Sequence, residues 1–258
     1  MFESSVSQKQ DFPSLVAEGL KIIDSAEKSG ATLRLMGGVA IKIHTTKLSD
    51  LHDRLGRSPG DLDFVGLKKQ SSTIKGIMET LGYEPNKSIN AYHGYKRQIW
   101  YSKANQIDIL FDIFEMNHVI DLKDRLRIDR PTIDVSDLFL QKIQIVQMNE
   151  KDLKDLFILL AEHDLGENDS DKINMDYVSK LLSEDWGFWY TTVLNLEKLN
   201  GMLTNYSQLS LDEKKSISTK SNTILEKIKS SPKSFRWKMR SKVGAKTQWY
   251  NLVEEVVR

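Results

Sequence analysis

Three aspartates on two short, half-apolar segments are the residues of this sequence best suited to chemistry. Asp61 and Asp63 are separated by one residue in the segment 61–65, and Asp108 stands between two isoleucines in the segment 106–114. Both segments alternate polar and apolar residues, which predicts half-buried β-strands. Side chains two residues apart on a strand leave the same face, so Asp61 and Asp63 can share one divalent cation. Asp108 would present a third carboxylate from a neighbouring strand.

The chemistry that such carboxylates support is metal-assisted phosphoryl transfer. Mg²⁺ takes hard oxygen ligands and usually keeps room for water and substrate phosphates. The metal neutralises charge that develops on the phosphate, while a carboxylate orients or deprotonates the attacking hydroxyl, the role we expect of Asp108. An isolated Asp-x-Asp is a weak signal, because at a strand edge it can simply be solvated or cap a turn, here after Pro59-Gly60.

A glycine pair, Gly37-Gly38, lies between a strand-like run at 32–36 and a helix-like run at 39–43. Such a turn offers backbone N–H groups and a helix N-terminus to a phosphate, and no side chain obstructs close approach. By itself a Gly-Gly pair is more often a tight turn. Here the Gly-Gly pair and the Asp-x-Asp motif occur together in one order of elements: strand, Gly-Gly, helix, acidic strand, helix, and strand with a third aspartate. This combination is far rarer than the Gly-Gly pair or the Asp-x-Asp motif alone.

These residues must be positioned by a small mixed sheet flanked by helices. Apolar spacing predicts an opening helix that ends before Ser29-Gly30, a helix over 71–82, and a strand over 97–102 that pairs with 106–114. From Ser136 the spacing becomes helical, with expected helices over roughly 136–148, 150–163, 173–182, 187–206 and 211–230. The sequence therefore predicts an α+β fold, with a catalytic domain over 1–135 and a helical domain over 136–258 that completes the active site.

The motifs LMGGVAIKIH, RSPGDLDFVG and QIDILFD together resemble the core signature of the DNA polymerase β-type nucleotidyltransferase superfamily, with the AbiEii-like group as the most similar branch. The resemblance covers about residues 33–160. It implies that Asp61, Asp63 and Asp108 bind the metal and act in catalysis. The interval between Gly38 and Asp61 is longer than is usual in this group.

Further site residues are implied by the same resemblance. Gly37, Gly38 and Arg57, just ahead of the acidic strand, are expected to bind substrate. The group also has a lysine on a helix after the sheet, followed by a basic-Asp-x-x-Asp sequence, which Lys142 and the segment 151–155 match in order. Lys142 is therefore expected to act in catalysis by pointing its own positive charge at the triphosphate, and Asp155 is expected to assist in substrate binding. Without the resemblance, Lys142 reads as an ordinary solvated lysine of a helix.

The activity implied is transfer of a nucleoside monophosphate from an NTP, with Mg²⁺ or Mn²⁺, onto a hydroxyl of RNA, protein or a small molecule. Several members of this group are toxins of toxin–antitoxin pairs, so an antitoxin protein is among the candidate partners. The main alternative is a catalytically silent nucleotide- or RNA-binding protein with the same fold. An aminoglycoside-type resistance enzyme is a third option, which a basic C-terminal segment disfavours because the acceptor would be cationic.

The segment 227–250 combines basic and aromatic residues. Its cations include Lys238, Arg240 and Lys242, and no acidic residue lies between Lys227 and Lys246. Such a pattern can follow a phosphate backbone and stack on bases, which makes RNA, tRNA included, a candidate partner. An amphipathic terminal helix with aromatics inward and lysines outward explains the pattern equally well.

Other polar groups carry weaker signals. Asp112 follows Asp108 by four residues and is a reserve metal ligand on the same strand face. The five histidines show no pair at metal-ligand spacing, which argues against zinc. The acidic segment 164–171 lacks the glycine and glutamate positions of a calcium-binding EF-hand and reads as a solvated loop.

The amino-acid composition says more about the cellular compartment of the protein than about its chemistry. There are 37 basic and 36 acidic residues, a formal charge of +1, and no cysteine. The start lacks a basic segment followed by an apolar run, and no uncharged apolar stretch of about 20 residues is present. We therefore expect a cytoplasmic protein without a membrane partner.

Overall fold

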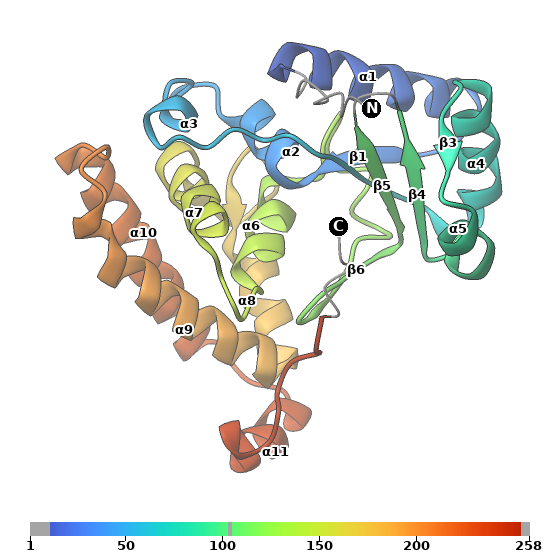
Figure 1. Ribbon diagram of the computed structural model, residues 1–258. Coiled ribbons are helices and arrows are strands. Elements are labelled where there is room, and N and C mark those ends of the chain that lie inside the picture. Colours follow the sequence, from blue (N-terminus) through green and yellow to red (C-terminus); the bar gives the residue numbers. More distant parts are fainter. Residues whose placement is uncertain (1–10, 103–104, 254–258) are drawn as a thin grey trace, which may run out of the picture. The chain divides into compact units, whose positions relative to one another are not determined.

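The computed structural model describes residues 11–102 and 105–253, and it confirms the predicted α+β class (Figure 1). The described chain divides into two compact units. The first consists of residues up to 43, 58–114 and 121–133, and the second of residues 44–57, 115–120 and 134 onward. Besides the residues beyond the expected boundary near 135, the second unit thus takes in two earlier segments.

A five-stranded mixed sheet forms the centre of the first unit. Its strand order is β1-β2-β5-β4-β3, in which β2 and β5 are parallel and the other neighbours are antiparallel. The strands are β1 (Leu33–Met36), β2 (Leu62–Gly66), β3 (Glu84–Pro85), β4 (Arg97–Tyr101) and β5 (Gln106–Phe111). The sequence predicted every one of these strands except the two-residue β3, but the single strand expected over 106–114 is interrupted at Asp112, which has φ +60°. Beyond the sheet, β6 (Ile113–Glu115) pairs with β7 (Val119–Asp121).

Helix α1 (Phe12–Lys28) covers part of this sheet and packs beside α4 (Ser71–Thr80) (Figure 1). It begins at the N-cap Asp11, whose carboxylate accepts from the backbone N–H of Ser14 at 2.9 Å. Its apolar stripe, which includes Leu15, Ile22 and Ile23, is fully buried. The remaining helical elements of this unit are α2 (Gly37–His44), most of which belongs to it, η1 (Lys68–Gln70) and α5 (Lys87–His93).

The turn from β1 into α2 depends on glycine at position 37. Gly37 has φ +70°, and a Cβ built on it would lie 2.8 Å from Oδ2 of Asp63. Met36, the residue before it, is the ladder partner of Asp63. The predicted strand-to-helix turn therefore lies directly against one of the predicted metal-binding aspartates.

Helices make up most of the second unit, with α10 packing against α7, α8 and α9. Ser210 and Glu213 form a reciprocal capping box at the start of α10. The elements are α3 (Leu51–Arg54), α6 (Val135–Ile143), α7 (Glu150–Glu162), β8 (Leu165–Gly166), β9 (Ile173–Asn174), α8 (Met175–Glu184), α9 (Trp186–Met202), η2 (Leu203–Asn205), α10 (Leu211–Ser230), α11 (Phe235–Val243) and η3 (Gly244–Lys246). Of the helices in the described residues, none is long and apolar enough to cross a membrane.

Two helix boundaries differ from the sequence-based prediction for reasons of tertiary packing. Helix α6 ends at Ile143 instead of near 148, because the Asn195 side chain donates to the carbonyls of Ile143 and Ile145 at 2.7 and 2.9 Å. Helix α8 begins at Met175 instead of 173, because β9 first pairs with β8. Side-chain donors and strand partners from elsewhere in the chain thus decide where these helices end and begin.

The Gly37 turn leads to a stability prediction. Gly37→Ala should lower the free energy of unfolding by more than Gly30→Ala, measured by urea denaturation. Both glycines have φ near +70°, so each alanine carries a conformational cost of about 1–2 kcal/mol. Only at position 37 does the added methyl also meet Asp63, whereas a Cβ at Gly30 has nothing within 4 Å. Equal losses in the two variants would show that Asp63 moves aside at no cost.

Candidate functional site

Asp63 and Asp108 are direct ladder partners in the parallel pair β2–β5. Paired residues of neighbouring strands present their side chains on the same face, with Cβ atoms about 5 Å apart. The Asp108 side chain is 17% exposed, and Asp63 is half-buried. Asp61 is exposed and lies just before β2, which begins at Leu62 instead of at 61 as expected. The sheet thus brings two of the three predicted carboxylates together and leaves Asp61 at the entrance of the strand.

Arg97 is a member of this group that the sequence analysis did not identify. Its Nε donates to both carboxylate oxygens of Asp108 at 2.9 and 3.1 Å, and its Nη2 also donates to Oδ2. Asp108, through hydrogen bonding, and then Asp63, through charge, raise the pKa of Arg97 against the opposing effect of burial. The predicted pairing of 97–102 with 106–114 could have pointed to Arg97. In the observed register Ile99 lies opposite Asp108, and Arg97 lies diagonally beside Asp108 on the same face of the sheet.

Asp112, the reserve ligand, serves a different purpose. It follows the end of β5, has φ +60°, and its Oδ1 accepts from the backbone N–H of Lys68 at 2.9 Å. Four residues along a strand correspond to about 13 Å, so Asp112 lies at the far end of the strand from Asp108. Its carboxylate holds the turn after β2.

Arg57, Lys142, Asp152 and Asp155 form a second group, in the second unit. Asp155 is fully buried and accepts from Arg57 in a bidentate pair, with Nε–Oδ1 at 2.7 Å and Nη2–Oδ2 at 2.9 Å. Lys142 Nζ lies 2.9 Å from Asp155 Oδ2 and 3.2 Å from Asp152 Oδ1, and its side chain is 13% exposed. The structure thus unites Lys142, which was predicted to act in catalysis, with Arg57 and Asp155, which were predicted to bind substrate, in one buried ion network.

The charges in this network keep one another ionised. Burial alone would raise the pKa of Asp155, but the charges and hydrogen bonds of Lys142 and Arg57 outweigh it and hold that pKa below its usual value. Burial likewise opposes the charge on Lys142, and the two aspartates, Asp155 foremost, raise its pKa in spite of that. Lys142 is therefore not the solvated helix lysine that its sequence context alone suggested.

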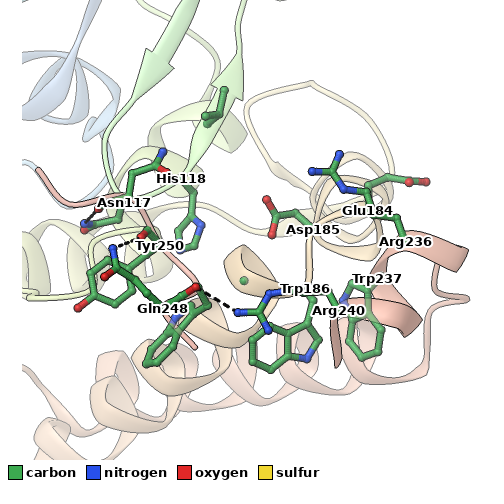
Figure 2. Close-up of a pocket in the computed structure, with 14 residues that line it drawn as sticks. Asn117, His118, Glu184, Asp185, Trp186, Arg236, Trp237, Arg240, Gln248 and Tyr250 are labelled. Atoms are coloured by element: carbon green, nitrogen blue, oxygen red, sulfur yellow. Dashed lines mark hydrogen bonds between the residues drawn. The ribbon is translucent and has the colours of Figure 1, made fainter. Parts of the chain in front are cut away.

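Within the second unit, a pocket of about 410 Å³ lies beside the C-terminal segment (Figure 2). Its walls combine aromatic rings with charges of both signs, in a volume within the range of small-molecule sites. Arg240 lies over the ring of Trp186, 4.8 Å from its centroid, and its Nη1 donates to the carbonyl of Gly244. Other lining residues include Asn117, His118, Asp185, Arg236, Trp237, Trp249 and Tyr250.

Trp237 and Trp249 of the C-terminal segment anchor it to α9, whereas Phe235 is 78% exposed. Trp249 Nε1 donates to the Thr191 hydroxyl at 3.0 Å, and that oxygen lies 2.8 Å from His118 Nε2. Burial lowers the pKa of His118 to about 4 although Asp185 opposes the shift, so this ring is neutral at pH 7. Trp237 packs edge-to-face on Trp189. The two tryptophans of the segment thus pack inward, while Lys238 and Lys242 are exposed.

The Asp155 network predicts a pH-dependent loss of stability. Asp155→Asn should lower the free energy of unfolding at pH 7 by about 3–5 kcal/mol, because two buried cations lose a shared counter-ion. Asp155 has a folded-state pKa below the unfolded value of about 3.9, so its contribution is complete above that pH and disappears as the pH falls through the folded pKa.

Urea unfolding at several pH values measures this contribution. The difference between wild type and Asp155→Asn should shrink toward acid pH. Asp152→Asn is the matched control and should cost less, because Lys142 keeps Asp155 as its partner. A similar cost in both variants would mean that Asp155 has no special place in the network.

No family model matches the chain, and no curated protein matches it. The chemistry of the site is therefore inferred from the residues themselves, above all from Asp63, Asp108 and the glycine turn beside them.

Proposed function

We propose that this protein is a metal-dependent nucleotidyltransferase that transfers a nucleoside monophosphate from an NTP to a hydroxyl group. One observation carries the proposal: Asp63 and Asp108 are side by side in the β2–β5 ladder, and the Gly37 turn lies against Asp63. Two carboxylates next to a side-chain-free turn at the start of a helix suit a site that must hold both a cation and a phosphate.

The donor atoms fit the magnesium ion that such a reaction uses. Asp61, Asp63 and Asp108 offer only hard carboxylate oxygens, which Mg²⁺ or Mn²⁺ accepts. Both oxygens of Asp108 already accept from Arg97, but a carboxylate has about four lone-pair positions, so the guanidinium and a cation can share it. When bound, the ion would neutralise charge on the triphosphate.

Each residue of the first unit then has a distinct task. Asp63 would hold the ion together with Asp61 at the entrance of β2, and Asp108 would orient the acceptor hydroxyl and accept its proton. Arg97 fixes the Asp108 carboxylate through its two Nε contacts and balances the charge of the acidic pair. Gly37 and Gly38 would admit the phosphates because neither carries a side chain, and the closeness of Gly37 to Asp63 puts this turn beside the acidic pair. The assignments of Lys142 to catalysis and of Arg57 and Asp155 to substrate binding stay predictions.

A catalytically silent nucleotide- or RNA-binding protein of the same fold is the alternative. Two carboxylates directly opposite each other destabilise a sheet, a cost that the pairing of Arg97 with Asp108 offsets in part. The presence of Asp63 and Asp108 as ladder partners favours the enzyme. A role as a toxin with an antitoxin partner, and a cytoplasmic location, follow from the sequence resemblance and composition and remain part of the proposal.

The first test replaces one carboxylate at a time with the neutral amide of asparagine. Asp63→Asn and Asp108→Asn should each reduce NMP transfer by at least about 100-fold while leaving the fold intact, because each removes a metal ligand or the base. Transfer is measured by incubating the protein with each labelled NTP, Mg²⁺ and total RNA.

Asp112→Asn is the matched control for this test. It lies on the same stretch of chain as Asp108, and asparagine also tolerates its φ of +60°. This variant should transfer NMP at the wild-type rate. Wild-type rates in folded Asp63→Asn would refute the mechanism, and binding of NTP without transfer by the wild-type protein would favour the silent alternative.

The exposed cations of the C-terminal segment favour RNA as the acceptor of the nucleoside monophosphate. Arg236, Lys238 and Lys242 are exposed on and around α11. Arg240, grouped with these cations on sequence grounds, instead binds the carbonyl of Gly244 and stacks on Trp186. The three exposed cations can therefore contact RNA phosphates. Arg240 is less available for such a contact, because it holds the segment together.

Replacing Arg236, Lys238 and Lys242 with glutamine in one triple variant should weaken RNA binding and make its affinity less dependent on salt. Each lost phosphate contact should lower the slope of log affinity against log salt by roughly 0.7, the value for single strands. Filter binding over a range of salt concentrations measures both quantities. The control replaces the exposed Lys21, Lys28 and Lys75 of the first unit, which removes the same charge elsewhere. If the two triple variants showed the same slope of log affinity against log salt, RNA would no longer be a candidate acceptor.

A further inference from the structure

Two histidines and an aspartate from distant parts of the sequence converge in the second unit. His44 Nδ1 lies 3.7 Å from Asp171 Oδ1, and His163 Nδ1 lies 3.3 Å from the same oxygen. One ligand atom from each of the three residues can be chosen so that all lie within 4.8 Å of one another. The two imidazole rings meet edge-to-face with centroids 5.8 Å apart.

These distances suit a shared metal ion better than hydrogen bonds. A contact of 3.7 Å is too long for a hydrogen bond, and 3.3 Å is beyond the optimum for N–H···O. In a tetrahedral zinc site with bonds of about 2.1 Å, neighbouring ligand atoms are about 3.4 Å apart. The two Nδ1–Oδ1 separations bracket that value. The competing interaction is a 3.3 Å contact between His163 Nδ1 and the main-chain carbonyl of Asp171.

A buried carboxylate holds the first histidine segment in place. Glu162, at the end of α7, accepts backbone N–H groups from Thr46, Lys47 and Leu48 at 2.8–3.0 Å. Because His163 follows Glu162 directly, the same clamp that fixes residues 46–48 brings His44 beside His163.

The third residue is supplied by the loop between β8 and β9. Lys220 donates to the carbonyl of His163 at 2.8 Å and pairs with Asp164 at 3.3 Å, which fixes the chain where it enters β8, just before this loop. Asp171 has φ +53°, a left-handed conformation that aspartate tolerates. Its side chain is 59% exposed, whereas those of His44 and His163 are 12% and 1% exposed. The cluster is thus buried on the imidazole side and open to water on the carboxylate side.

We propose that His44, His163 and Asp171 bind a zinc ion that ties residues 44–48 and the β8–β9 loop to the end of α7. Three protein ligands leave a fourth position that water can fill from the exposed side. Two imidazoles select a first-row transition metal over Mg²⁺, and among these zinc has high affinity for nitrogen ligands and accepts a tetrahedral geometry. The site is separate in residues and in ligand chemistry from the proposed magnesium site.

Calorimetric titration of Zn²⁺ into the full-length, chelator-treated protein, with Mg²⁺ in excess, tests the proposal. Wild type should bind one Zn²⁺ with a Kd of micromolar or below, and its Tm should rise. Asp171→Asn keeps a residue that tolerates positive φ and removes one ligand charge. It should bind Zn²⁺ at least about 10-fold more weakly, since even substitutions outside the ligand shell reach that size. His44→Gln should do the same.

The matched control is Glu167→Gln, an exposed carboxylate of the same loop that is not part of the cluster. It should bind Zn²⁺ as wild type does. Co²⁺ gives a second readout, because tetrahedral nitrogen ligation produces strong visible absorption that an all-carboxylate site does not. Absence of Zn²⁺ binding in wild type, or equal affinities of Asp171→Asn and Glu167→Gln, would overturn the proposal. NMP transfer assays in the same variants keep this outcome distinct from that of the proposed enzymatic activity.

Discussion

Two carboxylates placed side by side in a β-ladder repel each other, so the residues around Asp63 and Asp108 must hold them together in spite of that repulsion. Asp63 and Asp108 cannot move apart, because their strands are locked in parallel register by the residues that follow, Phe64 with Ile109 and Val65 with Leu110. Arg97 provides part of the compensating positive charge from the antiparallel neighbour β4. A sheet that keeps such a pair violates a rule of stable design, and such violations concentrate at functional sites.

Helix α7 has the corresponding role in the second unit. Its buried carboxylates Asp155 and Glu162 are seven residues apart, about two turns, and so lie on one side of the helix. Asp155 binds Arg57, and Glu162 binds the backbone of residues 46–48. Together they hold both ends of the segment 44–57, which explains why this early segment groups with the C-terminal helices. The position of His44 beside His163 follows from the same arrangement.

The sequence patterns predicted the elements of the fold well where local signals were strong. Alternation predicted β2, β4 and β5, and apolar spacing predicted α1, α4, α7, α9 and α10. Short elements were missed, among them α3, α5 and the pair β8–β9, because a few residues carry no measurable periodicity. Helix α6 was predicted too long, because Asn195, which caps its carbonyls, comes from α9.

The sequence by itself determined the α+β class and the candidate residues Asp61, Asp63, Asp108 and the glycine turn, because residue type, spacing and backbone freedom are local properties. The tertiary structure decided which of them meet. Strand register placed Asp63 beside Asp108 and Arg97 diagonal to it, and burial turned Lys142 from an apparent surface residue into a member of an ion network. Spacing also argued against a histidine metal site, yet folding brings His44, His163 and Asp171 together. Proximity between residues far apart in the chain is set by packing, which no local pattern encodes.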